Sequence, residues 1–169
     1  MITLRIFGTP GPQGSKRFVG TRNGRGVMVE SSAKVKPWRE AVKAACIEAM
    51  QGAIPLDGPL WVSMVFTLAK PASAPKRRRT FPQTKPDLSK LARSTEDALS
   101  DGGAWRDDAR VVEYLRLAKV YPGEDSGALH IPGAVISIYT EADMSSVEWR
   151  YAQRKGAVKA VEVELGVGQ

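Results

Sequence analysis

The sequence predicts one α+β domain in which two main helices pack on one face of a small mixed β-sheet. Apolar residues alternate with polar ones near the start of the chain, near its middle and again after residue 110, as they do in strands. Between these segments, two stretches repeat apolar residues every three or four positions, as amphipathic helices do. With 169 residues, 43% of them hydrophobic, the chain can bury one core without disulfides.

The N-terminal elements begin with a strand over residues 2–7, where isoleucine and leucine occupy every second position. Residues 8–17 contain too much proline and glycine for regular structure. Residues 22–26, Arg-Asn-Gly-Arg-Gly, are typical of a turn between two short strands, and residues 27–29 lie on its far side.

The first helix is expected to begin at Ser31 or Ser32, to hold Pro37 in its first turn and to end near Gly52. Its core-facing residues share one helical face: Trp38, Ala41, Val42, Ala45 and Ala49. The single cysteine, Cys46, lies among small apolar residues and is expected to be a buried thiol. One cysteine and one histidine exclude a disulfide framework and a zinc site rich in these residues.

The second helix follows a half-buried strand over residues 60–68 and a proline-rich loop over residues 71–86. Asp87 is suited to cap this helix, and Gly102-Gly103 ends it. The expected buried stripe consists of Leu88, Leu91, Ala92, Thr95, Ala98 and Leu99. The opposite side consists of Ser89, Lys90, Arg93, Ser94, Glu96 and Asp97.

The C-terminal part contains two further expected strands, over residues 111–120 and 134–140. The last 25 residues, 145–169, have no clear pattern and are expected to be peripheral to a single domain that spans residues 1–169. The sequence has no apolar run long enough to span a membrane and no signal peptide, so we expect a cytoplasmic protein.

Charge is distributed unevenly along the chain. The net charge is +7, yet seven of the eighteen acidic residues lie between Asp87 and Glu113. Residues 70–93 carry eight lysines and arginines and only one acid, which favours binding to nucleic acid through its phosphates. Acids beside such a basic segment are the pattern of a metal-dependent nuclease, although a solvated acidic helix face followed by an acidic turn would have the same composition.

Three of these acids could bind a metal ion. Asp87 begins the second helix, and Asp107 and Asp108 precede the strand that follows it. Magnesium commonly uses one or two carboxylates together with water and substrate phosphate. The sequence leaves open whether the Asp107-Asp108 pair reaches Asp87 within one chain.

The same region contains three motifs: Lys85-Pro86-Asp87-Leu88-x-x-Leu91, Asp97-Ala98-Leu99 and Gly103-x-Trp105-x-Asp107-Asp108-x-x-Val111-Val112. Together these motifs resemble those of a known family, the RusA-type Holliday-junction resolvases. The similarity is dense over residues 85–120, weaker around the Gly-Thr-Pro-Gly-Pro loop and Lys16-Arg17, and absent at the C-terminus. The resemblance implies a RusA-like fold and a homodimeric endonuclease from a bacterium or phage. Such an enzyme resolves four-way junctions with Mg²⁺, or with Mn²⁺ as a substitute, and needs no small-molecule cofactor.

The resemblance also implies roles for individual residues. Asp87 and Asp108 take the positions of catalytic aspartates, with Asp107 as a further metal ligand. Arg93 takes the position of the catalytic lysine, and Lys90 that of an asparagine. Ser89 takes the position of a second helical aspartate, and a hydroxyl is a poorer magnesium ligand than a carboxylate. Either Glu96 or Asp97 supplies a replacement, or the site works weakly, or the chain binds junctions without cleaving them.

The expected DNA-binding residues are basic: Lys16, Arg17, Lys76, Arg77, Arg78, Arg79, Lys85 and Lys90. The sequence thus supports three functions. The first is a magnesium-dependent nuclease for branched DNA that acts as a homodimer. The second is a junction-binding protein with weak or no cleavage. The third is a basic nucleic-acid-binding protein without catalysis.

Overall fold

The computed structural model describes residues 1–14, 16–22, 25–30, 33–75 and 77–145. The elements are β1 (Ile2–Phe7), β2 (Lys16–Arg22), β3 (Arg25–Glu30), α1 (Val35–Met50), β4 (Leu60–Thr67), α2 (Leu88–Asp101), the 3₁₀ turn η1 (Asp108–Arg110), β5 (Val111–Val120), β6 (Gly133–Thr140) and α3 (Glu141–Met144). The predicted order of strands and main helices is confirmed. The predicted helix start at Ser31 or Ser32 is wrong, because α1 begins at Val35 with Lys34 at its N-cap and Ala33 and Lys34 form a turn. Predictions for Lys76 and for residues 146–169 lie outside the described residues.

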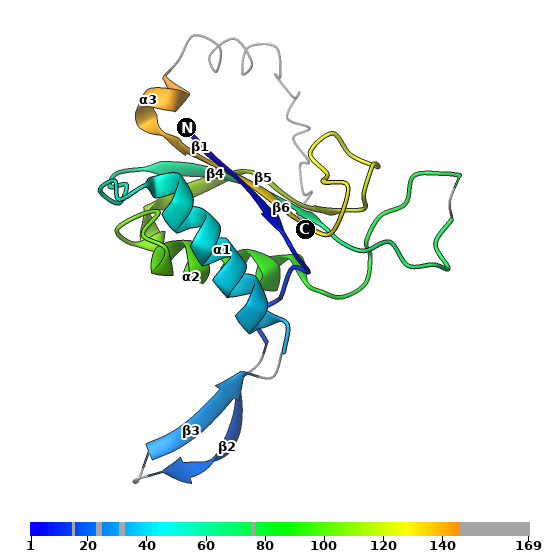
Figure 1. The fold of residues 1–169 in the computed structure, drawn as a ribbon, viewed down its shortest axis with the longest axis horizontal. Coiled ribbons are helices and arrows are strands. Elements are labelled where there is room, and N and C mark those ends of the chain that lie inside the picture. Colours follow the sequence, from blue (N-terminus) through cyan, green and yellow to red (C-terminus); the bar gives the residue numbers. More distant parts are fainter. Residues whose placement is uncertain (15, 23–24, 31–32, 76, 146–169) are drawn as a thin grey trace, which may run out of the picture.

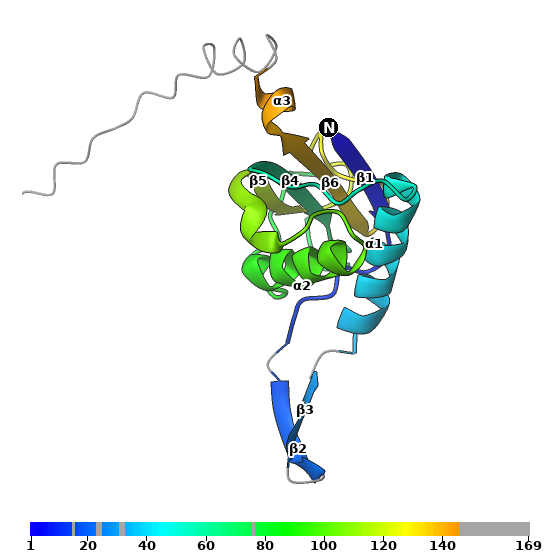
Figure 2. The ribbon, with the colours of Figure 1, turned by 90° about the vertical axis from the view of Figure 1, so that its left-hand side faces the viewer.

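The main sheet has the strand order β1-β6-β4-β5. The β4–β5 pair is parallel, and the β1–β6 and β4–β6 pairs are antiparallel, so the sheet is mixed. Helices α1 and α2 lie on the same side of it (Figures 1 and 2), which confirms the α+β prediction. Strands β2 and β3 form a separate two-stranded sheet that projects away from this body.

The core lies between the sheet and the two helices. Alternate residues of β4 and β6 are buried there together with side chains from α1 and α2. The Trp38 indole of α1 donates a hydrogen bond of 2.9 Å to Thr95 Oγ1 of α2, and its ring lies 6.3 Å from that of Phe66. A close crossing of the helices requires glycine at position 102, because a Cβ there would lie 2.8 Å from Cys46 Cβ.

Several predictions about burial need correction. In α1 the buried residues are Val35, Trp38, Val42, Cys46 and Met50, whereas Ala49 is exposed. Steps of four residues turn the stripe by about 40° each, which carries it from Trp38 through Cys46 to Met50. The expectation of a buried Cys46 thiol is confirmed, and burial raises the pKa of this thiol.

Two polar side chains are buried although the helical and strand patterns predicted otherwise. Ser94 of α2 is buried because its Oγ donates a hydrogen bond of 2.6 Å to the Gly11 carbonyl. Thr67 of β4 is buried because the segment after β5 covers it, and its Oγ1 accepts a hydrogen bond from Leu129 N at 2.8 Å. The C-terminal half of β4 is therefore buried on both faces rather than half-buried.

Candidate active site

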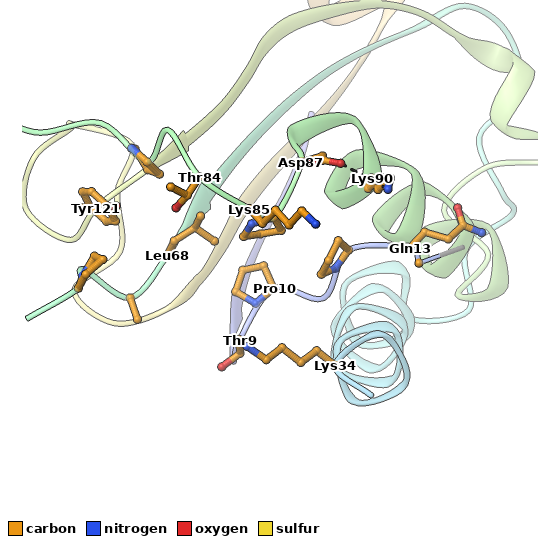
Figure 3. Close-up of a pocket in the computed structure, with 16 residues that line it drawn as sticks. Thr9, Pro10, Gln13, Lys34, Leu68, Thr84, Lys85, Asp87, Lys90 and Tyr121 are labelled. Atoms are coloured by element: carbon orange, nitrogen blue, oxygen red, sulfur yellow. Dashed lines mark ion pairs between the residues drawn. The ribbon is translucent and has the colours of Figure 1, made fainter. Parts of the chain in front are cut away.

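A groove with a volume of about 570 Å³ lies at the carboxyl ends of the parallel strands β4 and β5 (Figure 3). Leu68 and Tyr121, the residues that directly follow these strands, form part of its wall. The other lining residues come from the segments before β2, before α1 and before α2 and from the first turn of α2 itself: Thr9, Pro10, Pro12, Gln13, Gly14, Lys34, Ala69, Pro71, Pro82, Thr84, Lys85, Pro86, Asp87 and Lys90.

The wall formed by residues 9–14 is fixed against both helices. Gly11 passes so close to the start of α1 that a Cβ would lie 2.2 Å from the Lys34 carbonyl oxygen, so only glycine fits. The Gly11 carbonyl accepts the hydrogen bond from Ser94, and Gln13 N donates one of 2.9 Å to the Lys90 carbonyl. These bonds hold a proline- and glycine-rich segment beside the first turn of α2.

The opposite wall is held by β5. Lys119 Nζ donates hydrogen bonds to the carbonyl oxygens of Thr84, at 2.7 Å, and Pro86, at 3.0 Å. The peptide bond between Lys85 and Pro86 is cis. Asp87 follows at the N-cap position of α2, as predicted, although its side chain makes no capping hydrogen bond. Its carboxylate instead lies 3.4 Å from Lys90 Nζ, and both side chains are half exposed.

The groove is positively charged apart from Asp87. Lys34, Lys85 and Lys90 are its lysines, and Asp87 is its only acidic lining residue among those described. The amino end of α2 adds a partial positive charge, because the first backbone N–H groups of a helix point outward from its end. Figure 3 shows Asp87 and Lys90 on the α2 side of the groove and Thr9 with Lys34 on the α1 side.

The Asp107-Asp108 pair is placed by a buried tryptophan. Trp105 is 2% exposed, and its Nε1 donates a hydrogen bond of 2.7 Å to Ser100 Oγ. Asp107 caps η1 by accepting a hydrogen bond of 2.8 Å from Ala109 N. Asp108 begins η1 and is exposed, so its carboxylate is accessible to a ligand.

Glu96, which the sequence patterns placed on the polar side of α2, is half-buried and lies within range of the negative charge of Asp108. Glu96 accepts a hydrogen bond from the Tyr114 hydroxyl of β5. Burial, with the nearby negative charge of Asp108, raises the pKa of Glu96, whereas Tyr114 and Arg93 act in the opposite direction. Burial and the carboxylates of Glu96 and Asp108 raise the pKa of the Tyr114 hydroxyl in turn. Charged and polar side chains from α2, η1 and β5 thus influence one another electrostatically around Glu96.

The predicted site residues therefore occupy two regions along α2. Asp87 lies in the groove, while Asp108 lies beside Glu96, nine residues further along the helix, which corresponds to about 13 Å of helix axis. Within the described residues, no group of three or more histidine, cysteine, aspartate or glutamate side chains is arranged to hold a metal ion.

Position 89 lies between the two regions. Ser89, Arg93 and Glu96 are at i, i+4 and i+7 and therefore share one face of α2. Of the two acids considered as replacements for a carboxylate at Ser89, Glu96 lies on this face. Asp97 instead accepts hydrogen bonds from Gln13, at 3.2 Å, and Arg39, at 3.3 Å, toward α1. The geometry thus favours Glu96 over Asp97.

The predicted DNA-binding residues are spread over three places. Lys85 and Lys90 line the groove. Arg77 and Arg78 are exposed on the loop after β4, whereas Arg79 lies 3.4 Å from the Asp125 carboxylate, so part of the basic run is paired within the protein.

Lys16 and Arg17, expected in an irregular loop, instead begin strand β2. Lys34 is a groove residue that sequence reasoning missed, because only the close approach at Gly11 brings it to the groove. No helix in the described part of the chain is long and apolar enough to cross a membrane.

Comparison with known proteins gives one family. The family model for endodeoxyribonuclease RusA matches residues 8–131, which include the groove, α2 and the Asp107-Asp108 pair. A search of curated proteins found no match.

Proposed function

The chain belongs to the RusA endodeoxyribonuclease family, and we propose that it is a magnesium-dependent homodimer that nicks four-way junctions and other branched DNA. The observation that carries the proposal is the groove at the amino end of α2, which is lined by three lysines together with Asp87. Lysines neutralise phosphates, and a carboxylate among them is useful where a cation and a polyanion must bind together.

Each group has a task in this proposal. Lys34, Lys85 and Lys90 bind the phosphates of one DNA strand along the groove. The amino end of α2 favours a phosphate beside Asp87, because backbone N–H groups and the helix dipole both attract anions. Arg93 lies one turn above Ser89 on the same face, between Asp87 and Glu96 along α2. It stabilises the negative charge of the phosphate under attack.

The donor set suits magnesium, which takes oxygen ligands and usually needs only one or two carboxylates from the protein. The family pattern implies Asp87, Asp107 and Asp108 as the ligands, whereas the arrangement within this chain favours Asp108 together with Glu96, because Asp87 lies about 13 Å away along α2. When bound, magnesium supplies a nucleophile from water and stabilises the charge that develops during phosphodiester hydrolysis. Manganese, which prefers the same ligands, would substitute.

The homodimer follows from the substrate. Resolution of a four-way junction requires two nicks on strands related by an approximate two-fold axis, and a two-fold protein presents two equivalent sites.

A specific observation also favours a second function, that of a junction-binding protein that cleaves weakly. Ser89 is exposed, and Asp97, one of the two acids that could compensate for it, is bound by Gln13 and Arg39 instead. The site then depends on Glu96 to supply a second carboxylate near Asp108. If Glu96 does not serve, the lysines still bind DNA but the phosphodiester bond is cut slowly.

A junction-cleavage assay with and without magnesium separates the two functions. We expect magnesium-dependent nicks placed symmetrically across the junction, and their loss in Asp108→Asn with binding intact or tighter, because that variant removes negative charge facing DNA. Asp87→Asn and Glu96→Gln test the two candidate partners of Asp108. Asp101→Asn, whose carboxylate lies 2.7 Å from Arg39, is a control for the loss of an acid from α2.

Binding is measured in parallel by gel shift. We expect tighter binding to the four-way junction than to linear duplex and a steep decrease with salt, because each neutralised phosphate adds to the salt dependence. Binding to junction without nicking at any magnesium concentration would support the second function. Equal binding to junction and duplex, without nicking, would contradict both.

A further inference from the structure

The β2–β3 hairpin has no role in the function proposed for the groove and the carboxylates. It stands away from the sheet and helices in both views (Figures 1 and 2). Within the part of the chain that the structure describes, its strands pair only with each other, in an antiparallel register that runs from Lys16 opposite Glu30 to Arg22 opposite Arg25. Strands of six and seven residues give it a length of roughly 20 Å. An isolated two-stranded hairpin has little stability of its own, so a contribution to the stability of the core does not explain why the hairpin is present.

The hairpin is strongly basic. Strands β2 and β3 carry Lys16, Arg17, Arg22 and Arg25 against a single acid, Glu30. The acid lies opposite Lys16 at the base, whereas at the far end Arg22 and Arg25 are directly opposite each other. Two positive charges thus occupy opposed register positions at this end, and clustered positive charge attracts a polyanion.

The hairpin is also continuous with the groove. The chain leaves the groove wall at Gln13 and Gly14, passes through the hairpin and returns to the wall at Lys34. A DNA strand bound to the groove lysines would therefore lie at the base of the hairpin, and a duplex that contains this strand could extend past it. The major groove of B-DNA is about 12 Å wide and accepts a two-stranded ribbon.

We propose that the β2–β3 hairpin is a second DNA-binding element that lies against one duplex arm of the branched substrate. A ribbon of about 20 Å spans about 6 base-pair steps of 3.4 Å, so the hairpin would reach about 6 base pairs beyond the strand bound in the groove. This inference rests on the proposed function. A second copy of the chain is the competing partner, because the two edges of the hairpin could pair with another strand.

The test compares two charge-matched variants. Arg22→Gln with Arg25→Gln removes two positive charges from the end of the hairpin. Arg5→Gln with Lys43→Gln removes two from β1 and α1, outside the groove and the hairpin. Junction affinity is measured over a range of salt concentrations, and hydroxyl-radical footprints are recorded on the same junction. Far-ultraviolet circular dichroism and sedimentation report folding and oligomeric state.

We expect the hairpin variant to lose the protection that lies furthest along one arm while protection at the branch remains. The slope of log affinity against log salt should become shallower by about 1.8, since each phosphate contact contributes about 0.9. The control pair should keep the full footprint. Arg22→Lys with Arg25→Lys should also keep it, because phosphate contact needs charge more than the arginine fork.

Other outcomes refute the inference. A wild-type footprint that stops at the branch, or an unchanged footprint and salt slope in the hairpin variant, shows that the hairpin does not contact DNA. Dissociation of a dimer in the hairpin variant alone would assign the hairpin to contact between copies. A protein that neither nicks junctions nor prefers them to duplex would instead refute the proposed function, and its footprint on linear duplex would still decide whether the hairpin binds DNA.

Discussion

Replacement of Tyr114 by phenylalanine tests whether the Glu96 carboxyl is part of the catalytic site. The Tyr114 hydroxyl donates a hydrogen bond to Glu96, and this bond is the largest effect that opposes the rise in the pKa of Glu96 caused by burial. Phenylalanine keeps the ring on β5 and removes only this donor. The half-buried carboxylate then loses its partner while the negative charge of Asp108 remains nearby, so its pKa should rise further.

The size of the rise follows from the hydrogen bond. A bond to a charged group contributes about 1.5 to 3 kcal/mol, and the lower value applies because Glu96 is only partly buried. At 1.36 kcal/mol for each unit of pKa, a loss of about 1.5 kcal/mol corresponds to roughly one unit. Cleavage that requires ionised Glu96 increases as the pH rises through its pKa. The rising part of the pH–rate profile should therefore move to higher pH by about one unit.

Nuclear magnetic resonance of the Glu96 side-chain carboxyl in metal-free protein measures the pKa directly, and junction nicking at a series of pH values measures its consequence. Tyr139→Phe removes the same atom from β6 and is the matched control. An unchanged or lower pKa of Glu96 in Tyr114→Phe would refute the electrostatic argument. A raised pKa with an unchanged pH–rate profile would remove Glu96 from the catalytic site.

Three further predictions concern other parts of the molecule. Ser89→Asp should raise magnesium-dependent nicking in a metal titration, because it adds an anionic ligand in the first turn of α2, where Arg93 can pair with it; an unchanged rate would mean that another group already completes the site. Thr95→Val should lower the free energy of unfolding in urea by about 1 to 3 kcal/mol, because the buried Trp38 indole loses its acceptor, and Thr21→Val on β2 should have a much smaller effect. Arg116 holds the pKa of Asp125 below its ordinary value of 3.8, and the Gly127 amide donates a hydrogen bond of 2.8 Å to the Asp125 carboxylate. This bond is present above the pKa and lost as the pH falls through it, so the Gly127 amide resonance should change with a midpoint below 3.8. Arg116→Gln should move that midpoint upward.

Local pattern was sufficient for the order of the elements. Period-two alternation predicted β1, β4, β5 and β6, and the Gly102-Gly103 pair marks the end of α2 at Asp101. Side-chain burial that depends on a distant partner could not be predicted in the same way. Ser94 is buried only because the Gly11 carbonyl, 83 residues away, accepts its hydrogen bond, and Thr67 is buried because Leu129 lies over it.

The site shows the same division. The family resemblance identified Asp87 and Asp108 as candidate site residues. The sequence could not determine which part of α2 lies next to Asp108 after the chain turns back toward the sheet. The structure places Asp108 beside Glu96 because Trp105 anchors the turn between them. The bond from Tyr114 to Glu96 joins a strand to a helix, so neither residue's local pattern indicates it.

The shared face of Ser89, Arg93 and Glu96 has a consequence for how such a protein can change over evolution. One inserted residue between Ser89 and Glu96 would rotate the two ends of α2 by about 100° relative to each other and turn Glu96 away from Asp108. Because α2 is anchored at both ends, by Lys119 through the Pro86 carbonyl and by Trp105 through Ser100, the rotation could not be absorbed. Chemistry along this face should therefore diversify through exchanges of side chains at fixed positions, while differences in length accumulate in the loops that precede and follow the helix.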